Sequence, residues 1–323
     1  MTRIVVLAGG FGGAKLSHGV ALAAEPPGSG IELSVVVNTG DDLELHGLLV
    51  CPDLDTVLYT LAGLANDETG WGLRDETWSA TEMLGRYGSP TWFRLGDRDL
   101  ATHLVRSQRM RAGARLTEVE AELAAALGVR ARLLPMTDDI VRTHLRTDEG
   151  WLPFQDYFVR RRHADDVHEV HIHGIEAAEP TPEVLAAIEA ADRILVAPSN
   201  PFVSIGPILA VPGMLDALLA ASAPIVAVSP LIGGLAVRGP ADRMFVTLGG
   251  EASAVGVARH YTERYPGLLD GLVIDDVDAA QAEAIRALGL AVEVAPTLML
   301  TADDRRRLAL EVLAFAGSVP GSA

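Results

Sequence analysis

The segment that most constrains the fold is a short apolar run at the start of the chain that leads directly into glycines. Residues 3–8 read Arg-Ile-Val-Val-Leu-Ala and predict a buried strand of the parallel-sheet type. Gly9-Gly-Phe-Gly-Gly13 follows, and then we expect a helix over 14–24 and a second strand over 33–37. This order predicts a βαβ unit, in which the polar loops lie at the carboxyl ends of parallel strands.

The same alternation returns in the last third of the chain, so we predict an α/β fold with a doubly wound, mostly parallel, Rossmann-like sheet. The expected helices there are 183–190, 214–221, 252–261, 279–288 and 303–315, and the expected strands are 194–197, 225–229, 272–274 and 291–294.

The middle of the chain differs, because it contains all four tryptophans and most of the arginine-rich segments. We expect a helix at 117–127 and strands at 151–159 and 167–173 there. The prediction is therefore a core domain of residues 1–66 and 177–323, interrupted by a smaller α+β insertion, residues 67–176, that covers the functional site.

The glycine segment and the lysine beside it indicate a phosphate site. Gly10, Gly12 and Gly13 let backbone N–H groups and a helix N-terminus approach an anion closely. Lys15 is the only lysine in the chain, and every other basic residue except histidine is arginine. A chance surface lysine is the alternative. The pattern lacks the third glycine of a dinucleotide fingerprint and the end of a Walker loop, so it is weak alone.

Two acidic loops predict a Mg²⁺ site. Asp41 and Asp42 follow the second strand, and Asp53 and Asp55 follow Cys51-Pro52. Clustered carboxylates at one sheet edge repel one another unless a cation joins them, and Mg²⁺ shared with substrate phosphates is the usual solution. We name Asp41, Asp53 and Asp55 as metal ligands. For Asp53 a helix N-cap is the alternative, and Cys51 is expected to be a buried residue rather than a nucleophile.

Two further loops are candidates. Residues 94–99, Arg-Leu-Gly-Asp-Arg-Asp, place charges of both signs around one glycine, which indicates either anion binding by Arg94 or a solvated face. Ser199 and Asn200 open a proline-rich loop after a strand, which suits a nucleoside pocket or an ordinary βα loop.

Composition limits the classes of partner. The formal net charge of −17 makes nucleic acid and anionic membranes poor partners. One cysteine among 323 residues fits the reducing cytoplasm. The uncharged run 217–237 is long enough to span a membrane, but its prolines and glycines predict a helix, a strand and a loop. His171 and His173 fit a solvated strand face better than a zinc site.

At these motifs the chain resembles the 2-phospho-L-lactate transferases of coenzyme F420 biosynthesis over nearly its whole length. The shared strings are Gly-Gly-x-Gly-x-x-Lys-Leu at 9–16, Cys-Pro-Asp-Leu-Asp-Thr-Val-Leu-Tyr at 51–59, Leu-Gly-Asp-Arg-Asp at 95–99, Leu-Pro-Met-Thr-Asp-Asp at 134–139, Phe-Gln-Asp-Tyr at 154–157, Ser-Asn-Pro-x-x-Ser-Ile-Gly-Pro at 199–207 and Val-Ser-Pro-Leu-Ile-Gly-Gly at 228–234.

The resemblance implies a transferase. Its substrates would be a guanylylated three-carbon acid, either enolpyruvyl- or lactyl-diphospho-5′-guanosine, and the deazaflavin Fo. The ribityl 5′-hydroxyl would attack the phosphorus that carries the acid, and GMP would leave. The Ala- and Arg-rich composition looks like that of actinobacterial members, for which the enolpyruvyl donor is expected.

The resemblance and the motifs together assign the candidate residues. Asp41 and Asp55 would be catalytic, and Asp55 and Arg94 would bind the deazaflavin, although many relatives have lysine at the latter position. The residues expected to bind the guanylylated donor are Gly10, Gly12, Gly13, Lys15, Ser199 and Asn200. We also expect a cytoplasmic homodimer with Mg²⁺ as its cofactor.

Two other functions are possible from the sequence. A non-catalytic, nucleotide-sugar-binding regulator of the gluconeogenesis-factor type would explain the Gly9–Gly13 segment without catalysis. That group is not expected to carry the motifs at 51–56 and 95–99. An NAD-dependent oxidoreductase is disfavoured because Lys15 stands where the third glycine is needed.

Overall fold

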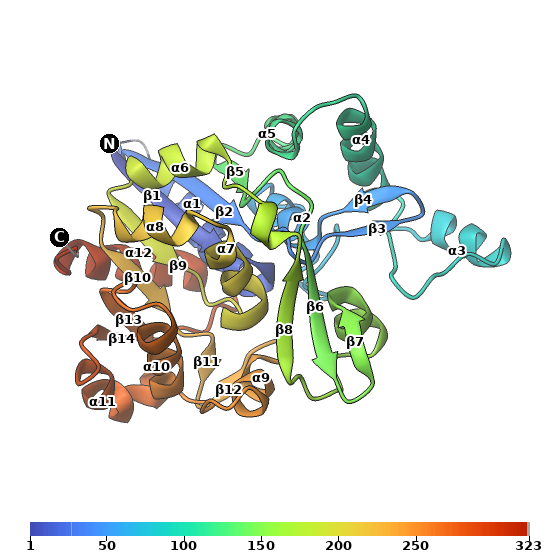
Figure 1. Ribbon diagram of the computed structural model, residues 1–323. Coiled ribbons are helices and arrows are strands. Elements are labelled where there is room, and N and C mark those ends of the chain that lie inside the picture. The colour runs from blue at the N-terminus through green and yellow to red at the C-terminus, as the bar shows by residue number, and fades with distance from the viewer. Residues whose placement is uncertain (27, 322–323) are drawn as a thin grey trace.

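A seven-stranded parallel sheet forms the centre of the structure, a computed structural model that describes residues 1–26 and 28–321; Pro27 and the last two residues lie outside it. The strands lie in the order β14-β13-β10-β9-β1-β2-β5 (Figure 1). Their bounds are β1 (Thr2–Ala8), β2 (Ile31–Val37), β5 (Arg132–Pro135), β9 (Arg193–Val196), β10 (Ile225–Val228), β13 (Gly271–Ile274) and β14 (Ala291–Val294). The predicted fold class is confirmed.

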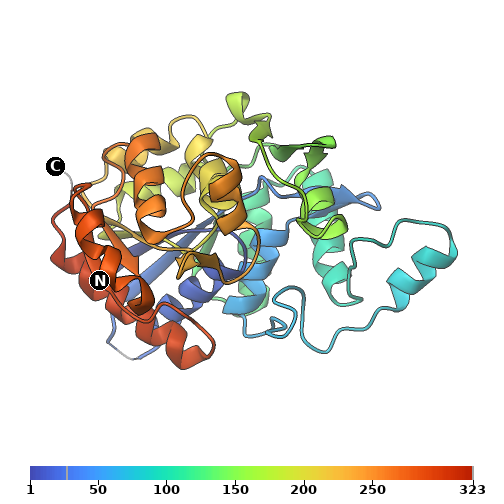
Figure 2. The ribbon, with the colours of Figure 1, turned by 90° about the horizontal axis from the view of Figure 1, so that it is seen from below.

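Helices cover both faces of this sheet (Figures 1 and 2). α1 (Gly10–Ala24), α2 (Pro52–Leu61) and α12 (Ala302–Ser318) pack on one face, where they meet Ile4 and Val6 of β1. Val5 and Leu7 of the same strand face the second core. The helices of that core are α6 (Pro182–Glu189), α7 (Gly206–Ala210), α8 (Met214–Leu219), α9 (Ala241–Thr247), α10 (Ala254–Arg264) and α11 (Ala282–Arg286). Because both faces of β1 are buried, its sequence is a continuous apolar run.

The strand order places a topological switch point beside β1. From β1 the chain moves outward through β2 to β5, and it later returns to pair β9 with the other edge of β1. The loops that follow β1 and β9 therefore leave the sheet in opposite directions. In open α/β sheets the crevice between two such loops is where ligands bind.

The middle of the chain contributes to the main sheet as well as to smaller units. Strand β5 lies within the predicted insertion, yet it pairs with β2 at the sheet edge, so residues 67–176 supply part of the core sheet. The smaller units are the hairpin β3 (Leu43–Leu45) and β4 (Leu48–Val50), the helices α3 (Ser79–Arg86), α4 (Asp99–Arg111) and α5 (Leu116–Ala126), and a sheet of β6 (Arg142–Thr147), β7 (Gly150–Pro153) and β8 (Glu169–His173). Figures 1 and 2 agree that α3 extends away from the body. The domain division remains a prediction.

Three expected elements differ from the structure. The strand expected over 151–159 ends at Pro153, because proline cannot donate a ladder hydrogen bond, and a π-helical turn, η1 (Asp156–Arg160), follows. The helix expected over 279–288 is a 3-10 turn, η4 (Asp276–Gln281), followed by the short α11. The helix expected from residue 14 begins at Gly10 instead, so the glycines form its first turn.

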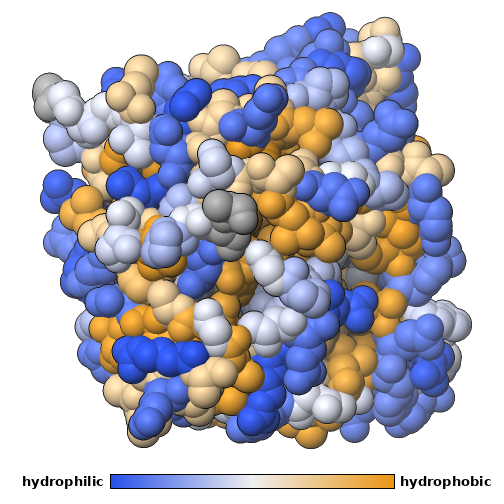
Figure 3. Space-filling model, turned by 60° about the vertical axis from the view of Figure 1, so that its left-hand side comes forward, coloured by the Kyte–Doolittle hydropathy of each residue, from blue (hydrophilic) through white to orange (hydrophobic). Residues whose placement is uncertain are grey.

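The uncharged run 217–237 divides as predicted into the end of α8, strand β10, and a hairpin of β11 (Leu231–Ile232) and β12 (Leu235–Ala236). Over the described residues, none of the helices has the length and apolar character needed to cross a membrane. Figure 3 shows hydrophobic and hydrophilic residues intermixed on the face that it presents.

Candidate active site

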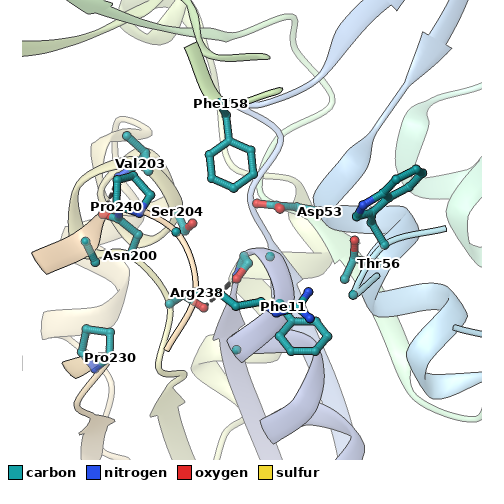
Figure 4. A pocket seen from close by; sticks show the side chains of 18 of the residues that line it. Phe11, Asp53, Thr56, Phe158, Asn200, Val203, Ser204, Pro230, Arg238 and Pro240 are labelled. Atoms are coloured by element: carbon teal, nitrogen blue, oxygen red, sulfur yellow. Dashed lines mark hydrogen bonds between the residues drawn. The ribbon is translucent and has the colours of Figure 1, made fainter. Parts of the chain in front are cut away.

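A pocket of about 580 Å³ opens at the switch point of the sheet. Its floor is the first turn of α1 after β1, and one wall is the loop after β9 (Figure 4). In Figure 4, Thr56 of α2 lies across the pocket from Asn200, whereas Asp53 and Ser204 approach each other beside Gly9. Thus the segments that the sequence placed at the carboxyl ends of the strands do meet in one cavity.

The first turn of α1 approaches the β9 loop so closely that it requires glycine. A Cβ at Gly12 would collide with the carbonyl oxygen of Pro198, and Gly10 has a φ of +59°, where a side chain is strained. The Ser199 hydroxyl joins the two loops, because it accepts from the Gly9 N–H at 3.2 Å and donates to the Gly9 carbonyl at 2.7 Å. Gly13 packs against Ala8 and is not part of the pocket lining.

Lys15 and Arg238 flank the ring of Phe11 on the pocket floor. The Lys15 ammonium and the Arg238 guanidinium each lie 4.3 Å from the Phe11 ring centroid. Lys15 donates to the backbone carbonyl of Met299. Burial, together with the nearby cations Arg305 and Arg238, lowers the pKa of Lys15 to about 8. The lone lysine is therefore a half-buried pocket cation rather than a chance surface residue.

Asp41 and Asp53 form an acidic pair in the pocket. Asn38, at the end of β2, donates to the Asp53 carboxylate at 3.0 Å and accepts from the Gly40 N–H at 2.8 Å. Burial and the neighbouring Asp53 raise the pKa of Asp41, and burial raises that of Asp53 to about 6. The Oδ1 atom of Asp41 is buried without a hydrogen-bond partner among the described residues.

Asp55 lies two residues after Asp53 in α2 and faces a different environment. Its carboxylate forms a two-bond ion pair with the fully buried Arg106 of α4, one bond being 3.2 Å long. Arg106 also donates to Glu120 of α5 at 2.7 Å, and His103 lies 3.7 Å from Asp55. Asp55 is not among the residues lining the pocket.

The predicted three-carboxylate metal site is therefore not assembled. In the described part of the chain, no group of three or more His, Cys, Asp or Glu residues could hold a metal ion by itself. Positions 53 and 55 of a helix point about 200° apart around its axis, so when Asp53 faces the pocket, Asp55 must face away. Asp41 and Asp53 remain as a two-carboxylate site, which suits a cation that also binds substrate phosphates.

The segment 94–99 has two separate roles. Arg94 lines the pocket beside Trp92 and Phe93, and its guanidinium lies 4.0 Å from the Trp78 ring. The rest of the segment has structural contacts. The Asp97 carboxylate accepts from the N–H groups of residues 79 and 80 at the start of α3, and Asp99 accepts from the Tyr59 hydroxyl at 2.7 Å.

Two predicted donor-binding side chains are used within the protein. The Ser199 hydroxyl is bonded to Gly9, and the Asn200 side chain accepts from the N–H groups of Phe202 and Val203 at 2.9 and 3.4 Å. Both residues nevertheless line the pocket. Cys51 is fully buried, and burial raises the pKa of its thiol, as expected of a structural residue.

Sequence reasoning missed one wall of the pocket. Phe154, Phe158, Arg162 and His163 of the η1 region line it, as does Arg238 from the loop after β12. Figure 4 shows the Phe158 ring pointing into the cavity toward Asp53. The Phe154–Tyr157 motif could have indicated this wall. The strand expected over 151–159 hid it, because a strand would point alternate side chains in opposite directions, whereas the π-helical turn does not.

Comparison with known proteins adds an independent result. The family model of the 2-phospho-L-lactate transferase CofD matches residues 4–312. A phosphoenolpyruvate transferase from Kitasatospora aureofaciens is 48% identical over 322 residues, covering 98% of each chain. One from Mycobacterium avium is 43% identical over 341 residues, covering 98% of this chain and all of that one. A crystal structure of a UPF0052 family member from Bacillus halodurans has a TM-score of 0.65 at 16% identity, with 97% of this chain and 98% of that chain covered. That last likeness concerns the fold.

The Asp55–Arg106 pair leads to a prediction about stability. We expect Arg106→Met to lower the free energy of unfolding by about 3–5 kcal/mol, because it leaves the buried Asp55 and Glu120 without their cation. Arg109→Met is the matched control, since Arg109 pairs with Glu122 on the same two helices but at the surface, and should cost at most about 1 kcal/mol. Urea unfolding measures both values. If Asp55→Asn leaves stability intact but abolishes turnover, Asp55 has the catalytic role expected from the sequence.

The lowered pKa of Lys15 leads to a pH prediction. Lys15 binds an anion only as the ammonium. If the pocket takes the guanylylated donor that the resemblance implies, the Kd for GDP, used as a probe for that donor, should rise as the pH increases through about 8, by up to about tenfold per pH unit. Calorimetric titrations from pH 6.5 to 9.5 measure this rise of the Kd with pH. Lys15→Met should bind GDP weakly at every pH in this range, with a Kd that does not change near pH 8. Lys15→Arg should also show no change near pH 8, because arginine stays charged. If the Kd for GDP still rises near pH 8 in both variants, the titrating group is not Lys15.

Proposed function

Because the chain belongs to the 2-phospho-L-lactate transferase CofD family, and so is a transferase, we propose that it acts in coenzyme F420 biosynthesis. It transfers a phosphoenolpyruvyl or 2-phospho-L-lactyl group from a guanylylated donor to the ribityl 5′-hydroxyl of the deazaflavin Fo. The names of its relatives favour the phosphoenolpyruvyl group. GMP is the leaving group.

One observation carries this proposal: the pocket of this acidic protein is lined by cations that have no acidic partner. Lys15, Arg94, Arg162 and Arg238 all line it, and within residues 1–26 and 28–321 none of the four forms an ion pair. Elsewhere buried and surface arginines are commonly paired with carboxylates. Four unpaired cations in one cavity of a chain with net charge −17 support a polyanionic ligand.

The donor diphosphate is assigned to the floor of the pocket. The N-terminal turn of α1 presents backbone N–H groups and the positive end of the helix, and Lys15 and Arg238 add two cations beside Phe11. The glycine at position 12 keeps this turn against the β9 loop. The guanosine would then extend along the wall that contains Ser199 and Asn200, where the backbone rather than the engaged side chains offers contacts.

Asp41 and Asp53 would hold the Mg²⁺ ion. Burial raises the pKa of both carboxyls, the neighbouring Asp53 raises that of Asp41 further, and the Asp41 Oδ1 atom has no hydrogen-bond partner among the described residues; a cation placed between the two carboxylates would stabilise both charges. Bound Mg²⁺ would neutralise charge on the diphosphate. With two protein ligands, the remaining coordination positions would be taken by donor phosphate oxygens and water. Asp55 is not part of this arrangement.

The acceptor ring is assigned to the aromatic wall. Trp71, Trp92 and Phe93 line the pocket on the side of Arg94, and the Trp71 and Trp78 rings lie 6.0 Å apart, edge to face. A flat tricyclic ring needs such apolar surfaces. From there the ribityl chain would extend toward Asp41 and Asp53.

Phosphoryl transfer requires positioning and charge neutralisation more than a protein nucleophile. The hydroxyl oxygen forms a bond to the phosphorus that carries the three-carbon acid, while the bond from that phosphorus to the bridging oxygen breaks. The oxygen and the remaining phosphate leave as GMP. The hydroxyl proton is released beside Asp41 and Asp53, whose carboxylates orient the hydroxyl and can accept it.

The decisive assay offers both guanylylated donors with Fo and detects products by mass spectrometry. We expect GMP release coupled to a phosphoester of Fo, in the presence of Mg²⁺, with loss of activity on chelation. Asp53→Asn should reduce kcat by about 100-fold or more, whereas Asp216→Asn, at an exposed position of α8 outside the pocket lining, serves as the acidic control. Full turnover after exhaustive chelation would show that Asp41 and Asp53 do not act through a metal ion. Turnover of neither donor would refute the proposed function.

The acceptor assignment has its own test. Arg94→Ala should raise the KM for Fo by about tenfold while the KM for the donor changes little, because Arg94 lies among the aromatic residues rather than at the α1 turn. Binding of Fo should also change tryptophan fluorescence. An effect of Arg94→Ala on the donor alone would move this residue to the phosphate side and contradict the placement.

A further inference from the structure

Three consecutive arginines end the η1 turn, and the third differs from its neighbours. Arg160 pairs with Asp156 at 3.3 Å, and Arg161 forms two hydrogen bonds of 2.6 Å with Asp165. Arg162 lines the pocket and forms no hydrogen bond or ion pair with the residues that the structure describes. Two guanidinium groups are thus used for structure, and one is left available to a ligand.

The backbone at this position has a conformation that side chains rarely adopt. Arg162 and His163 have φ values of +53° and +43°, consecutive left-handed residues that both line the pocket. Arg243 of α9 (Ala241–Thr247) holds them by donating to the carbonyls of His163 and Ala164 at 2.8 and 2.9 Å. The His163 N–H donates to the Tyr157 carbonyl at 2.8 Å. Strained residues persist where the surroundings fix them, commonly at functional sites.

The segment joins the pocket lining beside Phe158, whereas the proposed phosphate floor is built around Phe11. The His163 ring packs 5.3 Å from the Phe158 ring, which points into the cavity toward Asp53 (Figure 4). Phe158 lies close to Gly239, since a Cβ at that glycine would be 3.6 Å from its ring. Lys15 and Arg238 sit instead around Phe11 on the floor, and Arg94 sits among the tryptophans.

We propose that Arg162, with His163 beside it, is the subsite for the carboxylate of the three-carbon acid. This inference rests on the proposed function. The donor has two kinds of anionic group, a diphosphate and a carboxylate, and the diphosphate already has cations and helix N–H groups on the floor. Arg162 is the one pocket cation without an ion pair among the described residues that is not yet assigned to a substrate group, and a planar guanidinium matches a carboxylate with two parallel hydrogen bonds. The subsite selects donors that carry an acid over plain guanosine diphosphates.

Binding measurements test this assignment without turnover. Calorimetry gives the Kd of enolpyruvyl- and lactyl-diphospho-guanosine and of GDP, which lacks the acid, for the wild-type chain and its variants. We expect Arg162→Met to raise the Kd of both acid-bearing donors by about 10- to 100-fold, the size of a lost charged hydrogen-bond pair, and to leave the Kd of GDP unchanged. Arg162→Lys should give an intermediate loss of affinity for these donors, because lysine keeps the positive charge but cannot donate two parallel hydrogen bonds to a carboxylate.

Arg160→Met is the matched control, since Arg160 is an exposed neighbour paired with Asp156 and is not part of the pocket lining. It should change no Kd. Arg162 is itself exposed and has no hydrogen-bond or ion-pair partner in the described part of the chain, so its variants should keep the wild-type melting temperature, which circular dichroism checks.

Three results would overturn the assignment. An equal loss for donors and GDP would place Arg162 on the diphosphate. Unchanged donor binding combined with a raised KM for Fo would place it on the acceptor, and no change at all would leave it without a substrate contact. A wild-type chain that binds the donors but transfers nothing would refute the proposed function and leave this binding comparison valid.

Discussion

The contact between Gly12 and the carbonyl of Pro198 is the constraint on which the site depends. It joins the two loops that leave the sheet at the switch point, and any larger residue would push α1 away from β9. The Ser199 bonds to Gly9 exist only because the two loops are this close. The same approach places the N-terminus of α1 at the floor of the pocket, where Lys15 and Arg238 gather. One backbone contact therefore sets the fold of the switch point and the location of its charges together.

Helix α2 separates two electrostatic environments that share one acidic motif. Its pocket side carries Asp53, whose carboxyl is held by Asn38, and its opposite side carries Asp55, which is neutralised by Arg106. Breaking a buried pair is costly, so the Asp55–Arg106 contact fixes the rotation of the helix about its axis. That rotation decides which carboxylate faces the pocket. The second acid of the motif thus acts on the site by orienting the first.

The sequence was most informative where chemistry and periodicity agreed. The apolar run of β1 and the glycines that follow it predicted the sheet type and a pocket at the end of β1, because each feature has a local cause. Asp55 was misplaced because the sequence shows two carboxylates two residues apart but not the arginine, 51 positions away, that binds one of them. Arg162 was missed because its approach to the pocket depends on a left-handed turn. Arg238 was missed because it is held by a hydrogen bond to the backbone carbonyl of Thr69, which is 169 residues away in the sequence.

The scarcity of lysine has a consequence for work with the purified protein. Amine-directed reagents can react with only two groups in this chain, the N-terminal amine and Lys15, and the latter lies inside the cavity with a lowered pKa. Surface immobilisation, fluorophore attachment or cross-linking through amines would therefore either leave the body of the protein unmarked or obstruct its cavity. A ligand that fills the cavity would shield Lys15 and direct such reagents to the N-terminal amine, so that the protein could be labelled at that one amine.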